Sequence, residues 1–169
     1  MGSIPKRASD RFSKQTRRFQ RVLKRAIDRD INESDTVLII SDMLANVFGY
    51  DKYTEITSEF AIRGTYCDLA VKVDGNVKFL IEVKAIGLDL KESHIRQAIG
   101  YGAQHGIQWV VLTNGAEWQI YRLVFERPVR DELLCSFNFL DLSMRKKEDQ
   151  EMLYLLCKEG LSKDVIEEY

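Results

Sequence analysis

The 169-residue sequence contains no apolar run long enough to cross a membrane. A membrane-spanning helix needs about 20 consecutive apolar residues, and no stretch of this chain approaches that length. The N-terminus is basic and polar, without the apolar segment that a secretory signal peptide requires. We therefore expect a soluble, cytoplasmic protein with no membrane partner.

Cysteine and histidine are also scarce. The three cysteines, Cys67, Cys135 and Cys157, are far apart and form no CxxC pair. With only two histidines, His94 and His105, a zinc site is not expected, and both are interpreted as surface or packing residues. No GxxxxGK[ST] phosphate loop occurs, so no ATP-driven motor is predicted.

The basic residues are concentrated at one end of the chain. Residues 1–30 carry a net charge of +7 from ten basic and three acidic residues, whereas residues 31–169 carry −8 from 15 basic and 23 acidic residues. A basic arm on an acidic body can bind phosphate backbones, or it can fold back onto the body. The sequence leaves both interpretations open.

Hydrophobic periodicity predicts helices on both sides of a set of strands. The predicted elements are a helix over 9–30, a helix from Asn32 or Ser34 to Gly49, strands over 53–62 (ending near Gly64), 65–73 and 77–85, a helix opened by an Asp89–Glu92 capping box and ending at Gly106, strands over 109–113, 117–125 and 133–142, a helix near 147–158 and a short helix after Ser162. This order predicts the α/β (α+β) class, with a mixed sheet flanked by helices. We expect one domain in three parts: a basic N-terminal helical arm (1–30), a core (31–145) and a C-terminal helical extension (146–169).

The central hairpin is apolar on one face. Side chains alternate faces along a strand, and the odd-numbered residues are apolar in both strands, namely Cys67, Leu69, Val71, Val73, Val77, Phe79, Ile81 and Val83. The two apolar faces must coincide, so odd-numbered residues pair with odd-numbered ones. This parity excludes a two-residue Asp74–Gly75 turn and favours a three-residue loop with a bulge.

The opposite face of the hairpin brings three charged residues together. With Val73 opposite Val77, Asp68 lies opposite Glu82; an alternative odd-length loop makes the two acids diagonal neighbours. In both registers Asp68, Glu82 and Lys84 share one face. A surface salt bridge from Glu82 to a neighbouring lysine, worth about 0–1 kcal/mol, is the simplest explanation of such charges.

A metal site is the functional alternative. Two carboxylates about 5 Å apart on adjacent strands repel each other and raise one pKa. A divalent ion removes that conflict, and oxygen-only ligands suit Mg²⁺ or Mn²⁺. Lys84, beside Glu82, would hold an attacking water or stabilise charge on a phosphate in the transition state.

The segment YCDLAVKVDGNVKFLIEVKAIGLDLKESHIRQAIGYGAQHGIQWVVLTNGAEWQIYRL resembles the N-terminal nuclease domain of type I restriction enzyme R subunits. It resembles more closely the small stand-alone relatives of that domain in the PD-(D/E)xK nuclease superfamily. The resemblance covers residues 33–125 and implies a restriction-endonuclease-like core of αβββαβ order. It also implies that Asp68 and Glu82 are metal ligands and Lys84 the catalytic lysine, with Cys67 where the superfamily name has proline.

Three further residues are candidates from the same resemblance. Gln97 and Tyr101 match the Q-x3-Y spacing of RecB-type nucleases, and residues four apart share a helix face that would reach the metal or a phosphate. The alternative is an exposed glutamine and a half-buried tyrosine. The family often places an acid on the first core helix, so Glu33 is a candidate catalytic residue and metal ligand, although the helix dipole alone favours an acid there.

The sequence thus predicts a Mg²⁺-dependent (or Mn²⁺-dependent) endonuclease that hydrolyses DNA phosphodiester bonds in a restriction-modification setting. Its expected partners are DNA and either a second copy of the chain or a larger restriction or defence complex. The main alternative is a non-catalytic nucleic-acid-binding or regulatory module with a nuclease-like fold. A third interpretation is an interaction domain that docks a partner subunit through the basic helix and the hairpin at residues 74–76.

Overall fold

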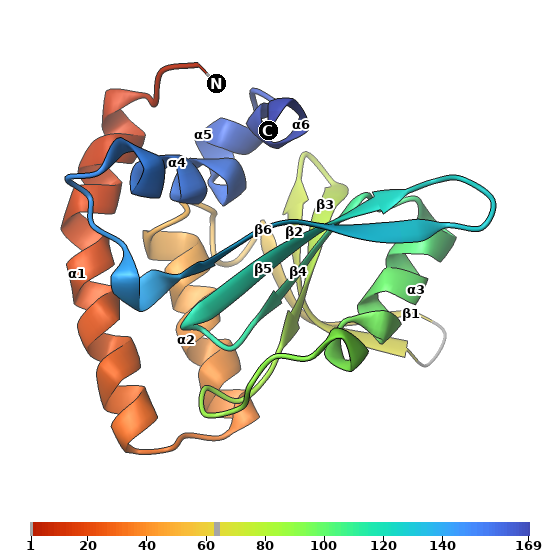
Figure 1. The fold of residues 1–169 in the computed structure, drawn as a ribbon, viewed down its shortest axis with the longest axis horizontal. Coiled ribbons are helices and arrows are strands. Elements are labelled where there is room, and N and C mark those ends of the chain that lie inside the picture. Colours follow the sequence, from red (N-terminus) through yellow and green to blue (C-terminus); the bar gives the residue numbers. More distant parts are fainter. Residues whose placement is uncertain (1, 63–64) are drawn as a thin grey trace.

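The computed structural model describes residues 2–62 and 65–169, without the side chains of residues 59–66. Six strands form one sheet in the order β1-β2-β3-β4-β5-β6 (Figure 1). Among these described strands β3 and β4 run parallel, and the other neighbouring pairs are antiparallel. The strands are β1 (Ile56–Ile62), β2 (Thr65–Val73), β3 (Asn76–Val83), β4 (Trp109–Thr113), β5 (Glu117–Val124) and β6 (Arg130–Asn138). The predicted mixed α/β class is confirmed.

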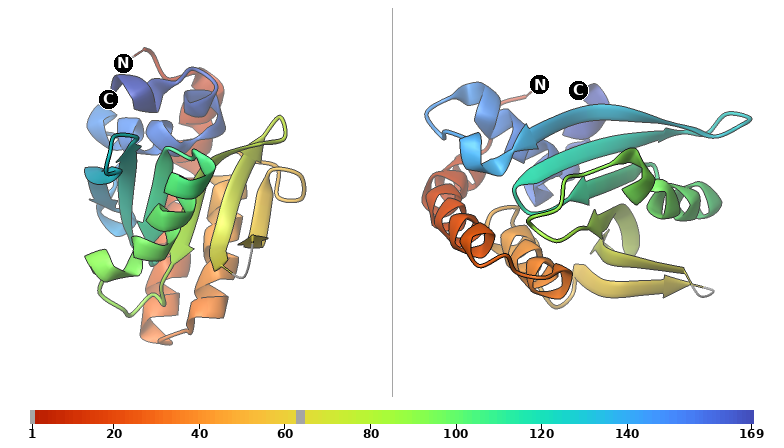
Figure 2. Two further views of the ribbon diagram at one scale, coloured as in Figure 1. Left: turned by 90° about the vertical axis from the view of Figure 1, so that its right-hand side faces the viewer. Right: turned by 60° about the horizontal axis from the view of Figure 1, so that its bottom comes forward.

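Helices cover both faces of the sheet (Figure 2). The helices are α1 (Lys6–Asp28), α2 (Glu33–Asn46), α3 (Arg96–His105), α4 (Lys147–Leu156), α5 (Lys158–Leu161) and α6 (Val165–Glu168), with short 3-10 turns η1 (Glu92–His94) and η2 (Phe139–Asp141). The larger hydrophobic cluster joins α1, α2 and the C-terminal helices to one face of the sheet. The smaller cluster lies between α3 and the other face. No helix in the described part of the chain is both long and apolar enough to span a membrane.

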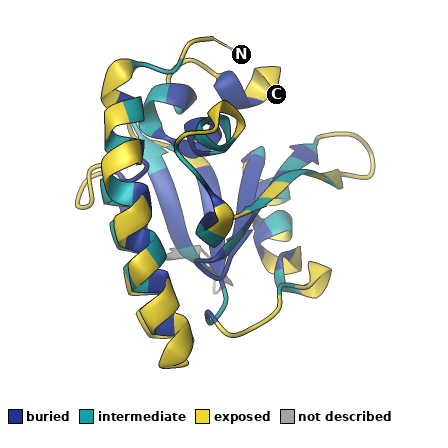
Figure 3. Cartoon of the chain, turned by 60° about the vertical axis from the view of Figure 1, so that its left-hand side comes forward, coloured by how far each residue is buried: buried dark blue, intermediate teal, exposed yellow. Residues whose placement is uncertain are grey.

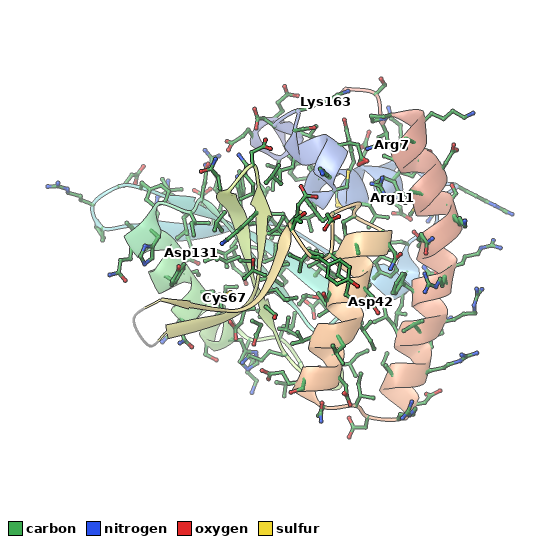
Figure 4. The ribbon with its side chains drawn as sticks, turned by 180° about the vertical axis from the view of Figure 1, so that it is seen from behind. Arg7, Arg11, Asp42, Cys67, Asp131 and Lys163 are labelled. Carbon is green, nitrogen blue, oxygen red and sulfur yellow. The ribbon has the colours of Figure 1, made fainter. Side chains whose placement is uncertain are left out.

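The N-terminal helix α1 packs against the body of the domain. Its buried residues, Ala8, Phe12, Thr16, Phe19, Leu23 and Ala26, form one stripe at three- and four-residue spacing. Arg11 fixes its N-terminal half by donating to both carboxylate oxygens of Glu159, each at 2.7 Å, and to the carbonyl of Val47 at 2.8 Å. Figure 4 labels Arg7 and Arg11 where α1 meets the C-terminal helices. The basic arm therefore folds back onto the body, and its charged face stays exposed (Figure 3).

The turn of the central hairpin corrects one prediction. Val73 is opposite Asn76, so Asp74–Gly75 is a two-residue turn, contrary to the odd-length loop expected. The φ angles of Asp74 (53°) and Gly75 (78°) are both left-handed, as a type I′ turn requires. Asp-Gly is among the dipeptides that best tolerate this backbone, and the local preference decides the turn.

A β-bulge restores the register beyond that turn. Lys72 pairs with Val77 while Val71 pairs with Phe79, so Lys78 is an extra residue in β3. Further along, odd-numbered residues pair with odd-numbered ones as predicted. The bulge reconciles a two-residue turn with coincident apolar faces: the prediction has a bulge within a three-residue loop, whereas the structure has it in β3 beyond the turn.

Other details differ from expectation. The last strand, predicted over 133–142, spans 130–138 and is followed by the turn η2. The helix after β3 is not capped at Asp89: the turn η1 comes first, and the backbone N–H of Lys91 donates to Nδ1 of His94 at 3.1 Å. Cys67 packs in the smaller cluster with α3 rather than with Leu69. The backbone pairing of β2 with β3 ends at Leu69 and Ile81. Beyond that point the thiol of Cys67 lies 3.1 Å from the carbonyl oxygen of Ile81. The expected strand end at Gly64 lies outside the described residues.

Candidate active site

The candidate site lies where β2 and β3 separate. The last paired residues of this ladder are Leu69 and Ile81, and continuing the same register places Asp68 beside Glu82. There, Oδ2 of Asp68 accepts a hydrogen bond from the backbone N–H of Val83 at 2.8 Å. In Figure 4 the adjacent residue, Cys67, is labelled on this part of β2. The bond directs the Asp68 carboxylate across to β3, as the predicted clustering of the acids requires.

Glu82 is a buried acid, with a residue exposure of 8%. Burial, and then the negative charge of Asp68, raise the pKa of Glu82 from 4.5 to about 8, while Lys84 opposes the rise. Burial and the neighbouring negative charge thus both favour the protonated form of the metal-free Glu82 carboxyl. Two acids that compete in this way form a site that a cation would stabilise.

Lys84 lies at the end of β3 beside Glu82. Its Nζ atom is 3.5 Å from Oε1 of Glu82, and its side chain is 22% exposed. Its backbone N–H donates to the carbonyl of Thr113 on β4 at 2.9 Å, which holds the strand end in place. The salt bridge considered from the sequence is thus present, within the same group of three charged side chains as Asp68.

Glu33 reaches the same region from α2. Asn32 caps this helix by accepting the N–H of Asp35 at 2.9 Å, which places Glu33 in the first turn. A groove of about 340 Å³ is lined by Glu33, Ser34, Val37, Leu38, Ser58 and Asp68. Among the described residues no three His, Cys, Asp or Glu side chains are grouped closely enough to hold a metal ion. Asp68 and Glu82 are adjacent carboxylates, and metal-binding roles for these two residues and for Glu33 stay predictions.

Gln97 and Tyr101 lie on α3 in different environments. Tyr101 is buried in the smaller cluster, where burial raises its pKa, and its ring centroid is 4.5 Å from that of His105. Gln97 is exposed in the first turn of the same helix. Their contact with a metal or phosphate stays a prediction, and the structure places only Gln97 where solvent reaches it freely.

His94 lies near the charges of Lys84 and Glu33. The sequence predicts only a surface or packing residue at this position. Burial, then the positive charges of Lys84 and Lys91, lower the pKa of His94, and Glu33 opposes this. Because Nδ1 accepts the N–H of Lys91, the neutral ring carries its proton on Nε2. His94 thus offers a hydrogen-bond donor near the charged cluster. No local motif indicates this, because the turn η1 brings the residue there.

The region that contains this arrangement matches one known family. Residues 39–133 match the family described as type I restriction enzyme R protein N terminus. That match spans more than half of the 169 residues. The chain belongs to this family of restriction-enzyme-related domains. The matched region contains Asp68, Glu82 and Lys84, whereas Glu33 and the whole of α1 lie outside it. No curated protein and no solved structure matches the chain.

Proposed function

We propose that this domain is a nuclease that hydrolyses DNA phosphodiester bonds with Mg²⁺ or Mn²⁺ held by Asp68 and Glu82. The observation that carries the proposal is the placement of these two carboxylates side by side, with Lys84 3.5 Å from Glu82. Membership of the restriction-enzyme family supports it. Glu33 and Gln97 are the further residues that we expect to assist, and Tyr101 would act by supporting α3.

The residues fit a hard divalent cation. Carboxylate oxygens are the ligands that Mg²⁺ and Mn²⁺ prefer, and Mg²⁺ sites commonly use one or two carboxylates plus water and substrate phosphate. The raised pKa of Glu82 has its origin in burial and in the nearby charge of Asp68, so a cation would take the place of the proton. The neighbouring thiol of Cys67 is directed to the carbonyls of Leu69 and Ile81 and does not join the oxygen set.

The three side chains would divide the work. Asp68 and Glu82 bind the ion, and the hydrogen bond from Val83 orients the Asp68 carboxylate before any ligand arrives. When bound, the ion supplies Lewis-acid chemistry that lowers the pKa of water and neutralises phosphate charge. Lys84 directs an ammonium group at the same place, where it stabilises negative charge that develops during the reaction.

The test is single-turnover cleavage of duplex, nicked, branched and single-stranded DNA across a Mg²⁺ and Mn²⁺ titration. We expect Glu82→Gln to weaken metal binding and cleavage together. Lys84→Ala should reduce cleavage by about 10²–10³-fold with little change in metal affinity, as for the loss of other electrostatic stabilisers. Lys78→Ala is the matched control, because Lys78 is an exposed lysine on the same strand outside the carboxylate cluster.

The alternative function is a nucleic-acid-binding or regulatory module without catalysis. It would be favoured if the wild type bound DNA but cut none of the substrates with either ion. Cleavage by Lys84→Ala at the wild-type rate would likewise contradict the proposed division of roles.

A further inference from the structure

The exposed face of α1 carries a continuous line of positive charge. The line, called here the basic stripe, consists of Lys14, Arg17, Arg18, Arg21, Lys24 and Arg25, all exposed. Spacings of three and four residues put these side chains on one face of the helix, opposite the stripe that is buried in the core. The basic stripe spans about 17 Å at 1.5 Å per residue. That length is about half of one turn of duplex DNA.

Among the described residues, no acidic side chain pairs with the stripe. In the described part of the chain, Arg7 and Arg11 of α1 form ion pairs, both with Glu159, and no residue of the stripe forms one. The only acids of α1 are Asp10 and Asp28, and they lie beyond the two ends of the basic stripe. Residues 31–169 carry a net charge of −8, so an anionic partner would be attracted to this helix and repelled elsewhere.

Two grooves connect the stripe to the candidate site. One groove is lined by Arg25 of α1, by Arg29 just after this helix, and by Asp35, Leu38 and Ile39 of α2, among others. Leu38, which is 64% exposed, also lines the groove that contains Asp68. A chain of phosphates leaving the stripe at Arg25 therefore has a surface path over the start of α2 to the carboxylates.

A third groove borders the N-terminal half of the stripe. It is lined by polar and basic side chains that include Ser13, Thr16, Arg17, Ser143 and Arg145. Hydroxyls and guanidinium groups are the donors that phosphate oxygens accept from.

We propose that the basic stripe is a docking surface for the phosphate backbone of duplex DNA, which it directs to the groove that contains Asp68. The inference rests on the proposed nuclease function for its destination, but the docking step itself needs neither metal nor catalysis. An anionic lipid surface is a poorer match, because a helix that lies in a membrane needs a free apolar face. In α1 that face is buried: Phe12 and Leu23 are 0% exposed.

The experiment measures duplex binding in a chelator, so that no cleavage occurs. A labelled duplex is titrated with protein across a salt series, using wild type and the triple variant Arg17→Gln/Arg21→Gln/Lys24→Gln. Each lost phosphate contact reduces the magnitude of the slope of log affinity against log salt by about 0.9. For the triple variant we therefore expect this magnitude to fall by about 2.7. Lys78→Gln/Arg127→Gln/Lys163→Gln removes three exposed charges outside α1 and should leave the slope unchanged.

A second variant separates charge from shape. Arg17→Lys/Arg21→Lys keeps both charges and should keep the wild-type slope. An unchanged slope in the triple glutamine variant, an equal loss in the control variant, or binding to anionic lipid vesicles but not to duplex would each overturn the proposal. If the wild type binds duplex with a steep salt dependence but never cleaves DNA, the nuclease function alone fails. If the wild type cleaves DNA while the triple variant keeps the wild-type salt dependence of binding, this inference alone fails.

Discussion

Oδ2 of Asp68 accepts the backbone N–H of Val83 across the gap between β2 and β3, at 2.8 Å. This single bond continues the sheet by a side chain where the backbone ladder has ended at Leu69 and Ile81. It also fixes a carboxylate beside Glu82. The residue that joins the strands is thus the same residue that we propose as a metal ligand.

Two substitutions at Asp68 separate its structural and metal-binding roles. Asp68→Asn keeps an acceptor for the Val83 N–H but loses the charge, so metal affinity should fall while stability changes little. Asp68→Ala leaves that N–H unpaired at a part-buried position, which typically costs about 1–3 kcal/mol. Calorimetric metal titration and thermal unfolding of both variants measure the two effects. Equal stability loss in the two variants would contradict the structural role.

Glu82→Gln should stabilise the metal-free protein at alkaline pH. The folded-state pKa of Glu82 is raised to about 8 by burial and by Asp68, so between pH 4.5 and 8 the folded state binds more protons than the unfolded state. Stability therefore falls as pH rises through that window, and glutamine, which does not ionise, avoids the loss.

Melting curves in a chelator from pH 5 to pH 9 test this expectation. At the alkaline end the variant should exceed the wild type in free energy of unfolding by about 1–2 kcal/mol, which is a few degrees in melting temperature. At the acidic end the difference should be small. A constant difference at every pH would mean that ionisation of Glu82 is not its cause.

Arg11→Met should destabilise the contact between α1 and the C-terminal helices. Arg11 and Glu159 have side chains only 18% and 12% exposed, and their bidentate pair would be broken. Burial of Glu159 opposes ionisation, but the hydrogen bonds from Arg11 still lower its pKa to about 2. We expect the free energy of unfolding to fall by about 2–3 kcal/mol, which lies between the typical costs of breaking exposed and fully buried ion pairs. Arg17→Met, at an exposed position of the same helix, is the control for denaturant unfolding.

The same pair predicts an acid-sensitive contact. Because the folded-state pKa of Glu159 is depressed, its stabilising effect is present above pH 4.5 and is lost as pH falls toward 2. The difference in unfolding free energy between wild type and Arg11→Met should therefore shrink over this range.

Gly160→Ala should disrupt the C-terminal helices. A Cβ atom at Gly160 would lie 1.8 Å from the carbonyl oxygen of Tyr154, so the backbone of α5 would have to move. We expect the free energy of unfolding to fall by about 3 kcal/mol, at the upper end of the usual cost of overpacking. Gly100→Ala, where the added Cβ meets nothing within 4 Å, is the matched control. Thermal unfolding of the two variants checks the prediction, and similar melting temperatures would contradict it.

Much of the fold is predictable from local sequence signals. The bounds of β2 agree with the prediction at both ends, because alternating apolar residues continue up to the Asp74–Gly75 turn. The same alternation predicts that Asp68 and Glu82 meet, since a slipped register would expose the apolar face. It does not predict the bulge at Lys78, because an inserted residue changes parity without leaving a compositional signal.

The surroundings of the site are less predictable. His94 is near the charge of Lys84 because of the path of η1, which depends on tertiary packing rather than on a motif. Gln97 and Tyr101 are four residues apart on α3, yet Gln97 in the first turn is exposed and Tyr101 is buried. Sequence patterns place residues on elements, and the approach of one element to another is set by the whole core.

The burial of α1 and the C-terminal helices has a practical consequence for the design of expression fragments. The family match covers residues 39–133, but the larger cluster also needs Phe12 and Leu23 from the N-terminal side and Tyr154 from the C-terminal side. A fragment trimmed to the matched residues would present the apolar side of its sheet, including Phe79, to water. We expect such a fragment to aggregate, so the smallest autonomous folding unit of this protein is larger than its recognisable signature.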